Sequence, residues 1–326
     1  MKRIIWLPVV IALGLAMPSP QVLAWGDDGH QIVGRIAARR LTENTKRQIV
    51  SILRKGGDDQ LHLPVLLGAP SDPQPSLTTL AEALGRMATW PDHMPEGKGR
   101  TGPWHFVDFG LFEGPNTTVN RCAEGCVTEL ITTLIANLRA KKSITVVEAQ
   151  GVKRTFPVDK ELRFLIHLFG DIHQPLHAST NADAGGNCEQ AIGFNGSSSL
   201  HSVWDTALVK LVKKPTLDGS ATALLTEFQS NALAGGITDP RQIAGESFAL
   251  AKNAAYPKVK PTAIPVIDHF VDVAPSECST KAPLEIRSVT VNGPASFDNA
   301  ASKKIVREQL FKAGVRLATV LNSLFM

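Results

Sequence analysis

Two pairs of histidine and aspartate, each separated by four positions, constrain this chain more than any other feature of its sequence. His167 and Asp171 form one pair, and His201 and Asp205 form the other. Positions i and i+4 share one face of an α-helix, so each pair would place an imidazole beside a carboxylate. Such a face can hold a metal ion. One pair alone could be two hydrogen-bonded polar groups, but its repetition in the chain favours a metal site.

The rest of the sequence pattern is mainly helical. Apolar residues recur at helical spacing from Ile32 to Leu41, and Thr42 is a candidate cap for a helix that ends before Gly56. Further helices are predicted over residues 80–89, 129–139, 161–168, 200–211, 221–233, 242–255 and 303–324. In the last of these, one stripe is expected to face the core, formed by Ile305, Val306, Leu310, Ala313, Leu317 and Leu321.

Two segments depart from the helical pattern. Asn195-Gly196 is a hairpin turn signal within residues 191–200, and Leu284, Ile286 and Val291 suggest a short strand. The chain has 326 residues and no long linker, so one domain is expected. We predict a single, mainly helical (all-α) domain over residues 25–326, with one or two small β-hairpins.

The first 24 residues have the pattern of a signal peptide that is cleaved after Ala24. Lys2 and Arg3 precede an apolar stretch, and Val22 and Ala24 are small residues where a signal peptidase would cut. Prolines interrupt the stretch, so a membrane anchor is the weaker alternative. Without these residues, 32 basic and 30 acidic side chains remain. This small surplus excludes a broad polyanion-binding surface, so any contact with nucleic acid must be local.

The four cysteines of this exported chain suggest two disulfides. Cys122 and Cys126 are close enough to close a small loop, and Cys188 and Cys278 would then pair by elimination. A zinc site made only of cysteines is the alternative, but the spacing lacks two C-x-x-C pairs.

Other segments add candidate ligands to the two pairs. Pro175 ends the helix after Asp171, so His177 can turn back toward the same pocket, whereas His173 points elsewhere on an ideal helix. Signal-peptide cleavage would give Trp25 a free amino group, which can chelate zinc together with its carbonyl. The full set of candidate ligands is Trp25, His30, Asp92, His105, His167, Asp171, His177, His201 and Asp205. These nitrogen and oxygen donors suit zinc, and three or four per ion would serve three ions.

Six motifs within residues 25–205 resemble those of the single-strand-specific zinc nucleases and 3′-nucleotidases of fungi and plants, which share a helical fold with bacterial zinc phospholipases C. The motifs are WGDDGH, WPD, WHFVD, HLFGDIHQPLH, DAGGN and LHSVWD, in that order.

The resemblance implies a division of the ligands among three zinc ions. One ion would be held by Asp92, His105, His167 and Asp171. Asp171 would bridge to a second ion, held also by His30 and by the Trp25 amino and carbonyl groups. The third would be held by His177, His201 and Asp205. Zinc lowers the pKa of bound water toward 7, so hydrolysis would need no nucleophilic side chain; Asp171 and Asp92 are the residues expected to matter most for catalysis.

In the family, the positions that match Phe106 and Asp108 hold a base by stacking and hydrogen bonding, which would demand an unpaired base. Phe106 could equally be a core residue. Asn187, after two glycines, is expected to orient the phosphate end of the site. One position departs from the family: relatives carry Arg or Lys three residues after the WPD aspartate, where this chain has Pro95, so Lys98 or Arg100 would have to replace that cation.

The resemblance thus implies a secreted or periplasmic zinc endonuclease. Its substrates would be single-stranded DNA and RNA, which it would cleave to products that carry 5′-phosphates, and also 3′-nucleotides. We expect a monomer with no stable membrane association. A zinc phospholipase C is the nearest alternative, although those enzymes have a longer gap between the first Trp and His and typically close the last site with Glu. A non-catalytic exported zinc-binding protein is the alternative of another class.

Overall fold

The structure is a computed structural model that describes residues 25–56, 61–94, 101–116, 122, 125–140, 144–147, 153–194, 196–229, 236–256, 273–288, 290–292, 297 and 299–326. The predicted signal peptide lies outside these residues, as do Asn195, Pro95, Lys98 and Arg100. Within the described part of the chain, no helix combines the length and apolar character needed to cross a membrane.

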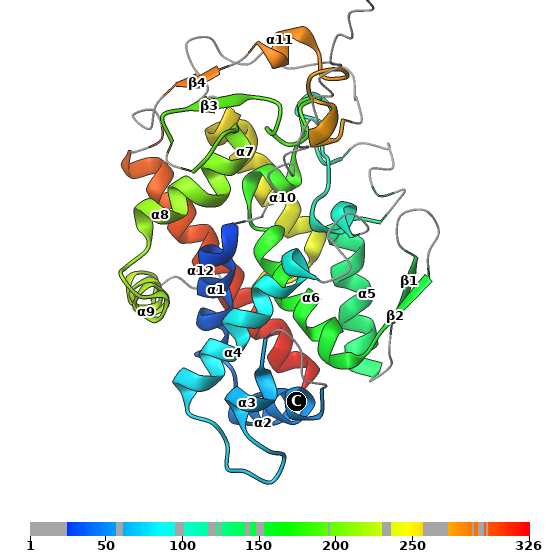
Figure 1. Cartoon of the computed structure of the whole chain (residues 1–326), viewed down its shortest axis with the longest axis vertical. Helices are drawn as coiled ribbons and strands as arrows, with labels where there is room; N and C mark the ends of the chain where they lie inside the picture. Colours follow the sequence, from blue (N-terminus) through cyan, green and yellow to red (C-terminus); the bar gives the residue numbers. More distant parts are fainter. Residues whose placement is uncertain are drawn as a thin grey trace, which may run out of the picture.

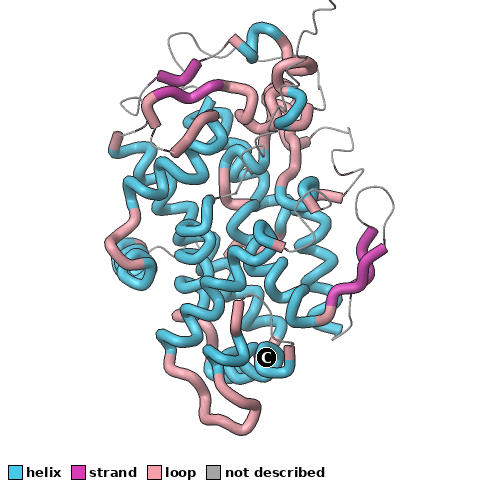
Figure 2. The backbone as a smooth tube through the Cα atoms, in the orientation of Figure 1, coloured by secondary structure: helices cyan, strands magenta, loops and turns pink. Residues whose placement is uncertain are grey.

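Helices dominate the fold, as predicted (Figure 2). The α-helices are α1 (Gly26–Ala38), α2 (Glu43–Lys55), α3 (Leu63–Leu67), α4 (Leu77–Thr89), α5 (Val127–Ala140), α6 (Val158–Asp171), α7 (Leu200–Ser202), α8 (Leu208–Val212), α9 (Leu217–Glu227), α10 (Pro240–Leu250), α11 (Leu284–Arg287) and α12 (Ala300–Leu324). Two π-helical turns continue α7 and α10, namely η6 (Val203–Ala207) and η8 (Ala251–Ala255). The 3₁₀ turns are η1 (Trp90–His93), η3 (Gly102–His105), η5 (Pro175–Ala178) and η10 (Pro275–Glu277).

Local sequence signals explain the helix boundaries. The Thr42 side chain accepts a hydrogen bond from the Thr45 backbone N–H and caps α2, which ends before Gly56 as predicted. The helix predicted over residues 221–233 begins earlier and ends at Glu227. The helix predicted over residues 200–211 is present, but its middle widens into the π-helical η6.

The strands are short and lie at the periphery of the helices (Figure 1). β1 (Ile144–Val147) and β2 (Lys153–Phe156) pair as an antiparallel hairpin, which the sequence analysis did not predict. β3 (Gln190–Ile192) pairs in parallel with β4 (Thr290–Asn292). Of the predicted hairpin over residues 191–200, the structure shows one antiparallel bridge, between Gln190 and Ser199.

The strand prediction at Leu284 and Ile286 is wrong, although Val291 does lie in β4. Leu284 and Ile286 belong to α11, which begins directly after Pro283. Pro fixes a φ angle that suits the start of a helix, and Ile286 is buried while Leu284 is exposed. Two apolar residues at i and i+2 were too little to distinguish a strand from one helical turn.

The central helix α1 packs against α4, α9 and α12, and α6 lies against α4, α5 and α12 (Figure 1). In the predicted α12 stripe, Val306, Leu310, Ala313, Leu317 and Leu321 are buried, whereas Ile305 is only partly buried. Gly34 lets α1 lie close to α4, and Gly314 lets α12 lie close to α1. A Cβ atom at residue 34 would overlap α4, and a Cβ atom at residue 314 would overlap α1. This packing brings the N-terminal end of α1 to the C-terminal end of α6.

Both predicted disulfides are present, Cys122–Cys126 and Cys188–Cys278. The second bond ties the segment before α11 to the loop that contains Gly185, Gly186 and Asn187. Because all four sulfur atoms are bonded in pairs, the alternative of a cysteine-only zinc site is excluded.

Candidate metal centre and base-contact segment

The last turn of α6 carries the first histidine–aspartate pair into the interior. His167 Nε2 lies 3.0 Å from Asp171 Oδ2, and neither residue is exposed to solvent. His167 Nδ1 donates to the Ala88 carbonyl of α4 at 2.6 Å, so Nε2 is the nitrogen that faces the carboxylate. Burial favours the neutral form of a carboxyl, but the charge of His167 and hydrogen bonds from His105 and His167 hold the pKa of Asp171 well below its usual value.

Two short turns add Asp92 and His105 to this pair. His105 Nδ1 lies 2.9 Å from both Asp171 Oδ2 and His167 Nε2. Asp92 Oδ1 lies 3.8 Å from His105 Nδ1 and 3.7 Å from His167 Nε2. The structure therefore brings together the side chains that the sequence analysis assigned to one ion, in a buried group that we call the Asp171 cluster.

The start of α1 reaches the Asp171 cluster from the other side. His30 Nε2 lies 3.4 Å from Asp171 Oδ1, and the His30 ring stacks on that of His167 with centroids 4.0 Å apart. Trp25 is fully buried, and its indole Nε1 donates to the Gly170 carbonyl at 2.8 Å. Trp25 is thus an anchored residue rather than a frayed end.

Gly170 contributes to this junction although the sequence analysis did not single it out. A Cβ atom at residue 170 would lie 2.7 Å from His30 Nδ1, so only glycine leaves room for the ring at its observed position. In the sequence, only its position directly before Asp171 in the HLFGD motif could have indicated that Gly170 contributes to the site.

A second buried group, which we call the Asp205 cluster, joins η5, α7 and η6. His201 Nε2 lies 3.1 Å from His177 Nε2 and 3.2 Å from Asp205 Oδ2. His177 Nδ1 donates to the His105 carbonyl at 2.8 Å, and His201 Nδ1 donates to the Gly185 carbonyl at 2.7 Å. Both rings therefore turn their Nε2 atoms inward.

The donors of the Asp205 cluster fit a cation. When each Nδ1 carries its ring's proton, two Nε2 lone pairs face each other, and a hydrogen bond between them is impossible. Burial lowers the pKa of His177 to about 4, so this ring is neutral near pH 7. Two ligands bound at about 2.0–2.1 Å to a tetrahedral zinc ion would themselves be about 3.3 Å apart. The observed separations of 3.1 and 3.2 Å match that arrangement.

Gln174 is a buried partner of the Asp205 cluster that the sequence analysis did not single out. Its buried amide Nε2 donates to Asp205 Oδ1 at 2.6 Å, and its Oε1 accepts from the Leu176 backbone N–H. The second bond fixes the orientation of the amide, because a flipped amide would point its NH₂ group at the Leu176 N–H, and two donors cannot form a hydrogen bond. Gln174 thereby holds one carboxylate oxygen and leaves Oδ2 for the cluster. The neighbouring His173 points away, as predicted, and its Nε2 lies 3.2 Å from Arg316 Nη1.

The predicted base-contact residues lie on the segment that follows His105. Phe106 and Asp108 are half-buried, so Phe106 is not a core residue. Val107 N–H between them donates to the His177 carbonyl at 2.8 Å, which places this segment beside the Asp205 cluster. Asn187 is also half-buried, and its Nδ2 donates to the Ala184 carbonyl at 2.7 Å.

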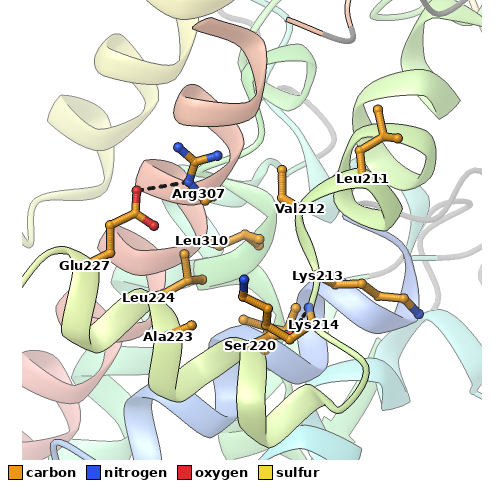
Figure 3. A pocket seen from close by; sticks show the side chains of 11 residues that line it. Leu211, Val212, Lys213, Lys214, Ser220, Ala223, Leu224, Glu227, Arg307 and Leu310 are labelled. Atoms are coloured by element: carbon orange, nitrogen blue, oxygen red, sulfur yellow. Dashed lines mark hydrogen bonds and ion pairs between the residues drawn. The ribbon is translucent and has the colours of Figure 1, made fainter. Parts of the chain in front are cut away.

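A separate cavity of about 320 Å³ lies between α9, α12 and the chain that leaves α8 (Figure 3). Leu224 and Leu310 line its interior, and Arg307 at its edge is paired with Glu227 at 3.0 Å. None of its lining residues belongs to the two clusters, so we assign it no part in their chemistry.

Comparison with known proteins matches residues 25–276 to the family described as S1/P1 nuclease. Endonuclease 4 of Arabidopsis thaliana is 24% identical over 93% of this chain and 90% of its own length. Endonuclease 3 of the same plant is 25% identical over 97% and 94%. Nuclease S1 of Aspergillus oryzae is 24% identical over 56% of this chain and 53% of its own length.

Proposed function

This chain belongs to the S1/P1 nuclease family and is a phosphodiester hydrolase, and from that membership we propose that it uses three zinc ions to cleave single-stranded DNA and RNA. The products carry 5′-phosphates, and 3′-nucleotides are a second substrate. The single observation that carries this proposal is the convergence of eight candidate donor side chains from distant segments into two adjoining buried clusters, with Trp25 buried beside one of them.

The donors divide among the ions as the family resemblance implies. Asp92, His105, His167 and Asp171 would hold one ion, and Asp171 would share a second with His30 and the Trp25 terminus. The contacts of both Asp171 oxygens support a bridging role, since Oδ2 faces His105 and His167 while Oδ1 faces His30. His177, His201 and Asp205 would hold the third ion.

Zinc, when bound, would activate water and stabilise the negative charge that develops on the phosphate and the leaving oxygen. The chain's own residues prepare the site for that chemistry. Backbone carbonyls fix the tautomers of His167, His177 and His201, and the buried rings exclude bulk water.

Single-strand preference would come from the segment beside the Asp205 cluster. We assign Phe106 to stacking on a base and Asp108 to hydrogen bonding with it. Stacking contributes about 1–3 kcal/mol per base and requires that the base be unpaired. Asn187, on the loop that also provides Gly185, is assigned to the phosphate.

Export to an oxidising compartment is part of the same proposal. Cleavage after Ala24 would expose the Trp25 amino group, and the family match begins at Trp25. The two disulfides fit an oxidising compartment, either the periplasm or the exterior. The protein would act as a monomer without stable membrane association.

The deciding experiment compares purified mature protein on single-stranded DNA, RNA, 3′-AMP, duplex DNA and p-nitrophenyl phosphorylcholine, with and without a chelator. Zinc content is measured on the same sample. We expect about three zinc ions per chain, cleavage of the first three substrates and loss of activity on chelation. Turnover of only the phosphorylcholine ester would instead identify a phospholipase C. Full activity of the metal-free protein would exclude the zinc proposal.

A further inference from the structure

Phe112 is a large aromatic side chain that the structure leaves 61% exposed. It lies six residues beyond Phe106 on the segment that follows His105. Exposing an apolar ring to water forfeits most of the stabilisation that burial would contribute. An isolated exposed hydrophobic residue needs no explanation, so its meaning depends on where the ring lies.

Backbone hydrogen bonds hold the chain that leads from the Asp205 cluster to Phe112. Val107 N–H donates to the His177 carbonyl at 2.8 Å, and Leu111 N–H donates to the Thr180 carbonyl at 3.0 Å. Gly114 N–H then closes the turn on the Gly110 carbonyl at 2.8 Å. Phe112 therefore stands within a hydrogen-bonded turn at a fixed place relative to a candidate ligand.

The side chains of this segment divide into an inner and an outer set. Val107 and Leu111 are buried, and the Phe109 ring packs edge-on against Phe248 with centroids 6.1 Å apart. Phe106 and Asp108 are half-buried, and Phe112 is exposed. Phe112 thus belongs with the residues that the segment presents outward, which include both proposed base contacts.

Phe112 is six residues beyond Phe106, and the backbone contacts on the two sides of this stretch fall on different residues. Val107 contacts His177, a member of the Asp205 cluster, whereas Leu111 contacts Thr180, three residues further along the chain. We therefore expect a mononucleotide held by the clusters and by Phe106 to leave Phe112 uncovered. A longer single strand that follows the segment would contact it.

We propose that Phe112 forms a second stacking subsite for an unpaired base of a polymeric substrate, outside the pocket that holds the base next to the cleaved bond. This inference rests on the proposed single-strand nuclease function. A stacking ring accepts any base, so the subsite would add affinity for polymers without sequence preference.

The test compares Phe112→Ala with wild type on a single-stranded dodecanucleotide and on 3′-AMP. We expect KM for the dodecanucleotide to rise by about 5- to 150-fold, the range that the loss of one base–aromatic stack gives. The kcat/KM value on 3′-AMP should stay within about twofold of wild type, because that substrate does not reach the subsite. Phe112→Trp should keep the low KM for the dodecanucleotide, because indole also stacks on a base. Phe112→Leu should raise that KM almost as much as Phe112→Ala does, although leucine is apolar.

Two controls separate stacking from general damage. Val65→Ala on the distant helix α3 removes apolar atoms from a residue that is 77% exposed and should change neither substrate's KM. Dodecanucleotides carrying single abasic positions complete a double-mutant cycle with Phe112→Ala. At the position that meets Phe112, the two losses should not add.

The outcomes distinguish the two proposals. A wild-type protein that cleaves neither substrate overturns the proposed function and the subsite with it. A wild-type protein that cleaves both, with an unchanged KM for the dodecanucleotide in Phe112→Ala, overturns the subsite alone. An equal loss on both substrates would also reject it, because it would show that Phe112 acts on the clusters.

Discussion

The two histidine–aspartate pairs have the same spacing but different surroundings. Asp171, at the end of the regular helix α6, has nitrogen atoms of three histidines within 3.4 Å, and these come from α1, η3 and α6 itself. Asp205, in the π-helical η6, faces His201 at 3.2 Å with one oxygen and the Gln174 amide at 2.6 Å with the other. Asp171 therefore contacts histidines from several segments. Asp205 has one oxygen bound to the Gln174 amide and only the other oxygen facing a histidine.

The difference shows that a four-residue spacing specifies a pair but not its function. Asp171 becomes central because α1, α4 and the turn at His105 all meet the C-terminal end of α6. Asp205 lies where a wider π-helical turn interrupts the helix, a feature that often occurs at functional sites. The predictions below test whether these two carboxylates differ as their contacts indicate.

The largest effect is expected from Asp171→Asn. The amide has no charge and can present only one oxygen, so the residue can no longer serve both groups of histidines. Turnover should fall by more than the 10- to 100-fold typical of losing an outer partner of a ligand, and zinc per chain should fall too. Asp92→Asn should be less damaging. Equal residual rates with unchanged zinc content in both variants would contradict the shared role of Asp171.

The next largest effect is expected when one residue is added before Trp25, whose amino group is a candidate ligand beside the Asp171 cluster. Mature protein that begins at Trp25 is compared with protein that retains one extra Met, both verified by mass. The extra residue turns the amino group into an amide, a poor zinc ligand, beside the buried junction of Trp25 with Gly170. We expect about one zinc ion fewer and a fall in turnover by orders of magnitude. Equal zinc and equal rate would remove Trp25 from the site.

A smaller effect, confined to the Asp205 cluster, is expected from Gln174→Leu. Asp205 Oδ1 would lose its donor and the carboxylate would be able to rotate. We expect zinc affinity for one ion to weaken by about 10- to 100-fold, measured by competition with a chelator. The cobalt absorption spectrum of that site should change as well.

The matched control for Gln174 is Gln309→Leu. Gln309 is equally buried, but its amide donates to the His173 carbonyl at 2.8 Å and contacts neither cluster. This variant should lose stability without a change in zinc affinity. A similar loss of affinity in both variants would assign the Gln174 effect to packing.

The smallest effect is a pH dependence of the free energy of unfolding, and it arises from Glu189. This residue is buried next to the loop whose Gly185 carbonyl accepts a hydrogen bond from His201. Burial, reinforced by the charge of Asp183, raises the pKa of Glu189 well above its usual value. The folded protein therefore keeps a proton that the unfolded chain releases above about pH 4.3. This contribution to the free energy of unfolding is complete below that pH and decreases as the pH rises toward the folded-state pKa.

Glu189→Gln tests this contribution because glutamine is permanently neutral. Relative to wild type, the variant should gain stability between about pH 5 and pH 8, measured by urea unfolding at both values with saturating zinc. Tyr256, whose hydroxyl donates to Asp183 at 3.1 Å, should remain in place in both proteins. A stability difference between variant and wild type that does not change with pH would show that Glu189 is ionised in the folded state.

Much of the fold could be predicted from the sequence because its signals are local. Thr42 caps α2 through a bond to the next turn, and the apolar stripe of α12 needs only helical periodicity. Leu284 and Ile286 were assigned to the wrong element because a four-residue helix carries no full period. The parallel pairing of β3 with β4 joins residues about one hundred positions apart, and nothing in either segment specifies that partner.

By itself, the sequence determined most of the helices and the type and spacing of nine candidate ligands, because each depends on side-chain chemistry within one short segment. The pairing of Cys188 with Cys278, 90 residues apart, followed from the sequence only by elimination. The tertiary structure decided which donors meet. Gly34 and Gly314 let α4 and α12 approach α1, Gly170 admits the His30 ring, and Gln174 selects one oxygen of Asp205. These relations depend on contacts within a few ångströms between segments far apart in the chain, and such contacts form only when the helices pack around a common core.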